Sequence, residues 1–365
     1  MVTKQNTTSK FERTLTLLHD PQASFAAEAI YSLSDLAGAE WDAFRATWPD
    51  LPVERRRDLV LRLVETAETN FELDFSAVIH LALEDPDPEV RRNAVEGVLE
   101  DAAMNTIERV MRMALHDPFS DVRAAAVRTL GLFVLQGELG KLPDYFNTRL
   151  QDTVLALYND LDEDFDVRRR ALEAISNCGL EGVQDMIYEA YQSDELPMRV
   201  SAIYAMGRSC DDMWSAQILD ELSSDEPELR YEAARAAGEL ELQKALPRLV
   251  ELAYEDDREI QEAAIWSLGE IGGSTARKVL TELAALADDV GDEELADAIA
   301  ESLSMASLAG QEMLPLFDFG DYDDEDDEDD DDLDLLRGDD YDEDDEDDEE
   351  EDADAWSSFE EDLRF

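Results

Sequence analysis

Leu229-Arg-Tyr-Glu-Ala-Ala234 and Ile260-Gln-Glu-Ala-Ala-Ile265 are two copies of the pattern that decides the fold of this chain. Each copy begins with an apolar anchor, usually followed by Arg, and places Ala and a second small or apolar residue four and five positions later. Three identical anchor spacings in a row indicate structural repeats, which have to be identified before any other feature. The anchors are Val90, Val122, Val167, Met198, Leu229 and Ile260, with spacings of 32, 45, 31, 31 and 31 residues.

The repeat extends beyond these six copies. Weaker copies occur upstream around Phe25 and Arg55. The 45-residue interval contains the stretch Gln136-Gly-Glu-Leu-Gly-Lys-Leu-Pro143, which we interpret as a turn-rich insertion between repeats.

Each repeat is expected to be a hairpin of two helices. The apolar positions 0, 4, 5 and 8 form one stripe of a helix, and an acidic or proline-containing turn such as Asp85-Pro-Asp-Pro88 precedes it. Carboxylates in such a turn can cap the helix N-terminus. A second amphipathic stretch, for example Trp214–Leu222 or Ala245–Ala253, lies between consecutive copies. A hairpin of this size cannot bury its own apolar face, so the repeats must stack.

The pattern therefore predicts an all-α fold, a right-handed α-solenoid of about eight to nine helical hairpins. The D-P-x-x-x-V-R-x-x-A-x-x-x-L-G signature resembles the short bacterial HEAT repeats, a type also found in phycobilin lyase subunits. The resemblance covers about residues 20–305. We divide the chain into a polar lead-in (1–19), the HEAT-repeat solenoid (20–308) and an acidic, low-complexity disordered tail (309–365).

The resemblance specifies architecture but not activity, because solenoids carry many unrelated functions. Deoxyhypusine hydroxylase, a related enzyme, holds two irons with paired His-Glu dipeptides. The three histidines of this chain are His19, His80 and His116, and none precedes a glutamate. Nothing in the sequence marks a pigment pocket of the phycobilin lyase kind. We therefore expect a protein that is not an enzyme, with no catalytic residues, no metal and no cofactor.

The two cysteines, Cys178 and Cys210, fall in helical patterns and have no metal-ligand spacing. We expect both to be small buried thiols.

The Arg that follows each anchor has two possible roles. In a stacked array it is expected to pair with turn carboxylates of its own or a neighbouring repeat, since its planar guanidinium meets a carboxylate in a bidentate manner. Such a ladder is structural and not a binding site. Its members are Arg91, Arg123, Arg168, Arg199 and Arg230.

Positions 2, 6 and 10 of the same helix point away from the packed stripe and should face the concave surface of the solenoid. Arg and large aromatic residues recur there, and these residue types are enriched where interfaces concentrate binding energy. We interpret them as a protein-binding groove. The alternative is a solvated face on which Arg235 bridges Glu239. The candidate residues are Arg92, Arg128, Arg169, Tyr204, Arg208, Tyr231, Arg235 and Trp266.

The formal net charge of −63 favours cationic partners and disfavours direct binding to nucleic acid or to an anionic membrane. Residues 318–365 hold 30 acidic side chains against Arg337 and Arg364. No apolar run is long enough to span a membrane and no signal segment is recognisable, so we expect a cytoplasmic protein.

The tail also contains apolar anchors, namely Phe317, Phe319, Trp356 and Phe359, which a pure solubility extension would not need. We expect it to engage a basic partner or to compete in cis for the groove. The leading hypothesis is thus a non-catalytic, protein-binding scaffold. The alternatives are a modifying enzyme of the lyase or hydroxylase kind, an acidic chaperone or nucleic-acid mimic, and, for the tail alone, a solvating extension.

Overall fold

The computed structural model describes residues 10–20, 23–98 and 103–309. All regular secondary structure in these ranges is helical, and most of the helices form consecutive hairpins. The chain begins with α1 (Lys10–Leu18), α2 (Ala27–Tyr31) and α3 (Gly38–Thr47). The first helices of the hairpins are α5 (Ser76–Ala82), α7 (Met104–His116), α9 (Asp144–Asn159), α11 (Val183–Tyr191), α13 (Ser215–Glu221), α15 (Leu246–Leu252) and α17 (Gly273–Val290).

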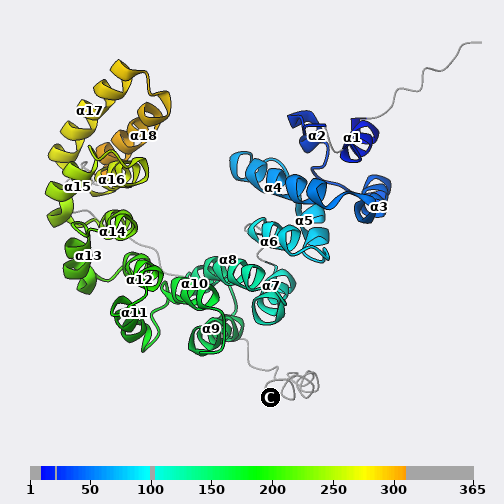
Figure 1. Ribbon diagram of the computed structural model, residues 1–365, viewed down its shortest axis with the longest axis horizontal. Helices are drawn as coiled ribbons and strands as arrows, with labels where there is room; N and C mark the ends of the chain where they lie inside the picture. Colours follow the sequence, from blue (N-terminus) through cyan, green and yellow to red (C-terminus); the bar gives the residue numbers. More distant parts are fainter. Residues whose placement is uncertain (1–9, 21–22, 99–102, 310–365) are drawn as a thin grey trace, which may run out of the picture. The chain divides into compact units, whose positions relative to one another are not determined.

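The second helices pack on one another in chain order, and we call them the second-helix row. Short 3₁₀ turns at Trp48–Asp50, Asp212–Trp214 and Gln243–Ala245 lead into the following helices. Figure 1 shows α7, α9, α11 and α13 along one side of this row, which leaves the opposite side of the row without a covering layer of helices in the described part. The row comprises α4 (Val53–Thr69), α6 (Pro88–Glu96), α8 (Ser120–Glu138), α10 (Phe165–Ile175), α12 (Leu196–Arg208), α14 (Pro227–Glu239), α16 (Arg258–Ile271) and α18 (Glu293–Ala309). The predicted all-α stack of helical hairpins is confirmed.

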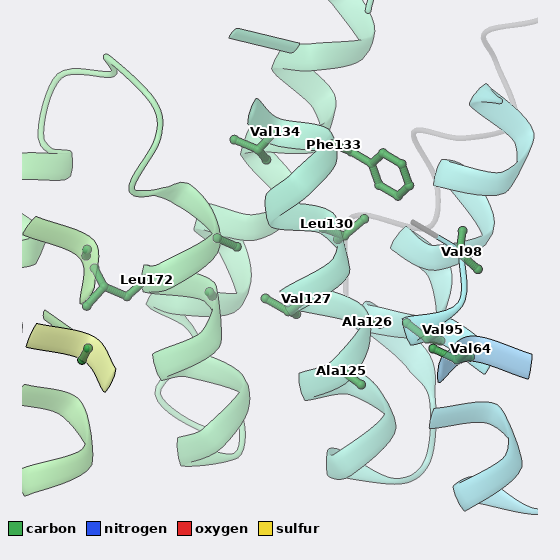
Figure 2. Packing of buried hydrophobic residues seen from close by; sticks show 14 of the residues in the cluster. Val64, Val95, Val98, Ala125, Ala126, Val127, Leu130, Phe133, Val134 and Leu172 are labelled. Atoms are coloured by element: carbon green, nitrogen blue, oxygen red, sulfur yellow. The ribbon is translucent and has the colours of Figure 1, made fainter. Parts of the chain in front are cut away.

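The repeat anchors form the centre of the core. Val90, Val122, Val167 and Leu229 are completely buried, and Ile260 is nearly so. Figure 2 shows how α8 joins its neighbours: Val127 and Val134 point to the side on which Leu172 of α10 lies, whereas Leu130 and Phe133 point to the opposite side. Each second helix therefore contributes apolar surface to the hairpins before and after it, which makes the core continuous.

Neighbouring helices of the row approach closely where the repeat has a small residue nine positions after the anchor. A Cβ on Gly207 of α12 would lie 2.8 Å from Cα of Ala236 on α14, and a Cβ on Gly238 would lie 2.9 Å from Cα of Ser267 on α16. Because the facing atoms belong to the backbone, the helices would have to separate to accept even a methyl group.

The Arg ladder has the structural role predicted from the sequence. Arg91 donates through Nε and Nη2 to the carboxylate of Asp117 in the next turn at 2.8 and 2.9 Å, and through Nη1 to the carbonyl of Asp85 in its own turn at 2.8 Å. Arg168 differs, because its Nε donates to the backbone carbonyl of Tyr158. The other members make the pairs Arg123–Glu163, Arg199–Glu221 and Arg230–Glu255.

Turn carboxylates cap some of the second helices, as expected. Asp87 accepts from the backbone N–H groups of Glu89 and Val90 at the start of α6, and Asp257 caps α16 in the same way. The N-cap position of α14, Glu226, makes no side-chain cap hydrogen bond.

Two boundaries differ from the sequence-based expectation. Residues 10–18, assigned to the polar lead-in, form α1, whose Phe11 and Leu18 are buried in the core. At the other end, α18 continues to Ala309. The acidic tail predicted for residues 309–365 otherwise lies outside the described residues.

The turn predicted within residues 136–143 is present at residues 139–143, but the long interval does not contain an inserted loop. Helix α8 continues to Glu138, and α9 begins at Asp144, so most of the additional residues lengthen the two helices instead of forming a loop. This extension is stable because it adds Phe133, Val134 and Phe146 to the core.

The two cysteines differ in environment. Cys178 is buried as expected, and burial raises the pKa of its thiol to about 12. Cys210 is exposed, contrary to the expectation, because it follows α12 with a φ of 51° in the turn toward the next hairpin.

None of the helices in the described part of the chain combines the length and the apolar content needed to cross a bilayer.

Candidate functional site

All eight residues predicted to form the groove lie on the second-helix row. Arg92 is on α6, Arg128 on α8 and Arg169 on α10, while each of the following helices contributes further members. Tyr204 and Arg208 are on α12, Tyr231 and Arg235 are on α14, and Trp266 is on α16. None of the eight is fully buried. The eight residues thus lie on six consecutive helices of the row, at positions two, six or ten after the anchor.

Most of the arginines on this face are paired with carboxylates. Arg128 Nη2 of α8 lies 2.7 Å from Glu96 Oε1 of α6. Glu239 of α14 lies within ion-pair distance of both Arg208 Nη1 (3.7 Å) and Arg235 Nη2 (3.6 Å). The solvated-face alternative, in which Arg235 bridges Glu239, is thus also present in the structure. Because the pairs Arg128–Glu96 and Arg208–Glu239 cross between helices, they hold neighbouring helices of the face in one arrangement.

Glu173 on α10 is the centre of a second group, which the sequence did not reveal. It accepts from Arg170 Nη1 at 2.6 Å and from Ser201 Oγ of α12 at 2.5 Å. Arg169 Nη1 lies 3.6 Å from the same carboxylate. The Ser201 contact joins α12 to α10, and the two arginine contacts lie within α10.

Tyr204 lies between these ion-paired groups, and burial raises the pKa of its phenol. It borders a cavity of about 290 Å³, together with Arg128, Arg208 and the exposed Leu132. The cavity is lined mainly by α8, α10 and α12, with Glu68 of α4 and Glu96 of α6 at its border. It combines apolar side chains with guanidinium groups that are paired with carboxylates.

At α14 and α16 the face is lined by several glutamates and by the aromatic rings of Tyr231 and Trp266. Tyr231 separates two open crevices of about 330 and 410 Å³, and Glu259 lines both of them. Glu232 lines the first, whereas Glu262 and Trp266 line the second. The carboxylates at these crevices were not among the residues predicted from the sequence. Their position one residue before the anchor, or two or three after it, is the signal that could have identified them.

The carboxyl group of Glu232 has a pKa above its ordinary value. Burial raises the pKa of its carboxyl to about 7. Arg235 lowers this pKa, and the charges of Glu173 and Glu239 raise it further, while Arg170 lowers it. The carboxyl therefore changes charge near neutral pH.

A further cavity of about 540 Å³ lies between the ends of α4 and α6 and helix α5. Val64, Ile79 and Phe75 give it an apolar lining, and the strongly exposed Phe71 stands at its edge. It adjoins the chain just before residues 99–102, which are outside the described ranges.

The described residues contain no group of three or more His, Cys, Asp or Glu side chains placed to hold a metal ion. The predicted tail anchors Phe317, Phe319, Trp356 and Phe359 lie outside the described ranges.

Solved structures similar to this chain are helical repeat proteins of low sequence identity. The complex of CpcE and CpcF of phycocyanin lyase from Nostoc sp. PCC7120 is 15% identical, with 76% of this chain and 98% of that chain covered and a TM-score of 0.48. Human deoxyhypusine hydroxylase in complex with glycerol is 18% identical, with 72% and 96% covered and a TM-score of 0.33. Importin beta is 13% identical, with 81% and 44% covered and a TM-score of 0.40. At these values the similarities carry no argument about activity or ligand.

A search of curated proteins gives no match to the sequence. The family model for HEAT repeats matches residues 75–154 and 215–304. These ranges include the hairpins from α5 to the first part of α9 and from α13 to α18, and the helices between them continue the same row. Residues 75–154 and 215–304 of this chain are thus HEAT repeats.

Proposed function

We propose that this protein is a non-catalytic scaffold that binds a protein segment along the uncovered face of its second-helix row. The observation that carries the proposal is the continuity of that face. Side-chain contacts on this face link α6 with α8 (Arg128–Glu96), α12 with α14 (Arg208–Glu239) and α14 with α16 (Arg235 with the Trp266 ring). Helix α10 packs against both α8 and α12 and completes the series. A continuous face of this kind suits an extended protein segment better than a small substrate.

The chemistry of the face supports binding and not catalysis. The arginines at its centre are committed to ion pairs with Glu96, Glu173 and Glu239. Aromatic side chains between them, at Tyr204, Tyr231 and Trp266, supply contact area without reactive groups. Partly buried aromatic and Arg side chains are the types that concentrate binding energy at interfaces.

The acidic tail belongs to the same proposal on the grounds of its sequence alone. Its excess of carboxylates favours a basic partner. Since most arginines of the face already have carboxylate partners, we favour recruitment of basic proteins by the tail over competition of the tail for the face.

Photocrosslinking tests the proposed face. A photoreactive amino acid is placed at Tyr204 or Trp266, and in a control at Tyr188, an exposed aromatic on α11. In extracts of the native host, the first two positions should capture the same protein and the control should not. Capture from Tyr188 alone, or capture of no protein from Tyr204 and Trp266, would contradict the proposal.

A further inference from the structure

The end of the second-helix row formed by α14 and α16 has carboxylates without cationic partners. Glu228, Glu232 and Glu259 make no ion pair within 4.0 Å with any residue that the structure describes. This contrasts with Glu96, Glu173 and Glu239 on the same row, each of which has an arginine partner. Glu228 and Glu259 therefore place negative charge without a cationic partner at the starts of α14 and α16.

Aromatic rings stand beside these carboxylates. Tyr231 lines both crevices, and the acidic residues around the first are Glu228, Glu232, Asp257 and Glu259. The second is lined by Glu259, Trp266, Arg235 and Glu262, of which Glu262 is paired with Arg258. The Trp266 side chain is 36% exposed. A guanidinium group can stack on an aromatic ring and pair with a carboxylate at the same time, a combination that an ammonium group matches less well.

The protein itself provides an example of such a contact. The guanidinium carbon of Arg235 lies 6.0 Å from the centre of the Trp266 ring, while the same side chain pairs with Glu239. The Arg235 and Trp266 side chains both line the second crevice, so this ring already contacts one guanidinium group there.

The size of the crevices limits what can enter them. Their volumes of about 330 and 410 Å³ are at the lower end of the range for small-molecule pockets, and both are open to solvent along the row. They are suited to single long side chains that project from a backbone lying across the helices. Because Tyr231 separates them, two such side chains could be held on either side of one ring.

We propose that the two crevices beside Tyr231 bind the arginine side chains of an extended basic segment of a partner protein. Charge complementarity identifies the occupant: unpaired carboxylates with aromatic walls fit a guanidinium group, and they repel an acidic segment or a nucleic acid phosphate. This inference rests on the proposed function, because it names the chemistry of the segment that the row binds.

The test measures binding of a fluorescent peptide with several arginines to the full chain, by fluorescence anisotropy at about 0.15 M salt, where long-range charge effects are largely screened. The same peptide with glutamine in place of arginine is compared. The first variant is Glu228→Gln with Glu259→Gln, which removes two unpaired and exposed carboxylates. The second is Trp266→Leu, which removes the aromatic wall of the second crevice.

The matched control is Asp288→Asn with Asp289→Asn. Both residues are exposed near the end of α17, away from the crevices, and the control changes the net charge by the same amount. All variants retain the acidic tail, so that its binding of the peptide is common to all of them.

The double glutamine variant should weaken binding of the arginine peptide roughly tenfold, and Trp266→Leu should weaken it by about two- to fivefold. The control should stay within about twofold of the parent protein, and the glutamine peptide should bind poorly to all of them. Equal losses in the control and the double variant, or no loss in either, would overturn the assignment of the crevices.

Failure of this inference can be distinguished from failure of the proposed function. If the arginine peptide does not distinguish the variants but the crosslinks from Tyr204 and Trp266 still capture a partner, the face binds a segment of different chemistry. If those crosslinks capture no protein, the face is not the binding surface.

Discussion

Arg91 and Asp117 form a bidentate pair that joins one HEAT repeat to the next. The two N–O distances are 2.8 and 2.9 Å, and the side chains are only 11% and 6% exposed. Asp117 also accepts from the backbone N–H of Phe119. One carboxylate thus organises the turn before α8 and connects it with α6, so the alignment of neighbouring hairpins depends on it.

Replacement of Asp117 by Asn should destabilise the fold. The amide can still accept from Phe119, but Arg91 loses its charged partner in a mostly buried position. We expect the free energy of unfolding to fall by about 2 to 4 kcal/mol, measured by urea denaturation. Glu282→Gln is the matched control, because its pair with Lys278 is exposed and long at 3.9 Å, and it should change the free energy by less than about 1 kcal/mol. Similar small effects of both substitutions would show that the ladder does not stabilise the stack.

Gly207→Ala should also destabilise the protein, although alanine is ordinarily the better helix former. The new methyl group would lie 2.8 Å from Cα of Ala236 and would force α12 and α14 apart. We expect a loss of about 1 to 3 kcal/mol in thermal or chemical denaturation. Gly179→Ala is the control, since a Cβ there meets no atom within 4 Å. A stabilised Gly207→Ala variant would contradict the close contact of the two helices.

Glu232→Gln should make stability less sensitive to pH. The folded carboxyl keeps its proton up to a pH of about 7, whereas the unfolded chain releases it near the ordinary pKa of 4.5. Folding therefore takes up a proton between these values, and the contribution of Glu232 to stability falls as the pH rises through this window. The charged groups around it are Arg170 and Glu173 on α10, Arg235 and Glu239 on its own helix, and Glu228, Asp257 and Glu259 at the first crevice.

The glutamine variant cannot lose a proton, so its stability relative to the parent should rise between about pH 5 and pH 7 and then level off. Urea denaturation at several pH values measures this difference. Glu228→Gln, an exposed carboxyl on the same helix, is the control. A difference that is constant with pH would mean that burial does not perturb Glu232.

Deletion of residues 311–365 should weaken the binding of basic peptides most strongly at low salt. The deleted segment includes the 30 acidic side chains of residues 318–365. We expect a loss of several-fold at about 0.05 M salt that disappears by about 0.5 M, because screening shortens the range of the attraction. A neutral segment of equal length is the control for chain length. An affinity that does not depend on the tail at either salt concentration would remove the tail from the proposed function.

The sequence was sufficient to predict the stack and its ladder, because both follow from local periodicity. The anchors of the repeat determine which side is buried, and an Arg that follows an anchor lies next to the acidic turns of its own and the next hairpin, as at Arg91. The sequence does not predict the extended helices α8 and α9, because Gly137 and Gly140 are typical of loops, although Gly137 lies within α8.

The details of the candidate site could be predicted only in part. Helical spacing placed all eight predicted residues on one face, yet it gave no information on which arginines are neutralised by a neighbouring helix. The contacts of Glu173 and Glu239 depend on how α10, α12 and α14 align, and this alignment is set by close contacts such as that of Gly207 with Ala236. The exposure of Cys210 likewise depends on the turn after α12.

Hydrogen–deuterium exchange of the full chain with and without the crosslinked partner, purified as a separate protein, tests the central claim most directly. The account predicts that the partner slows backbone exchange in α12, α14 and α16, where the aromatic and charged side chains of the face are located. Exchange in α11, α13 and α15 should change little, because these helices lie on the other side of the row. Slower exchange confined to α11, α13 and α15 would show that the partner binds the opposite surface and would contradict the account.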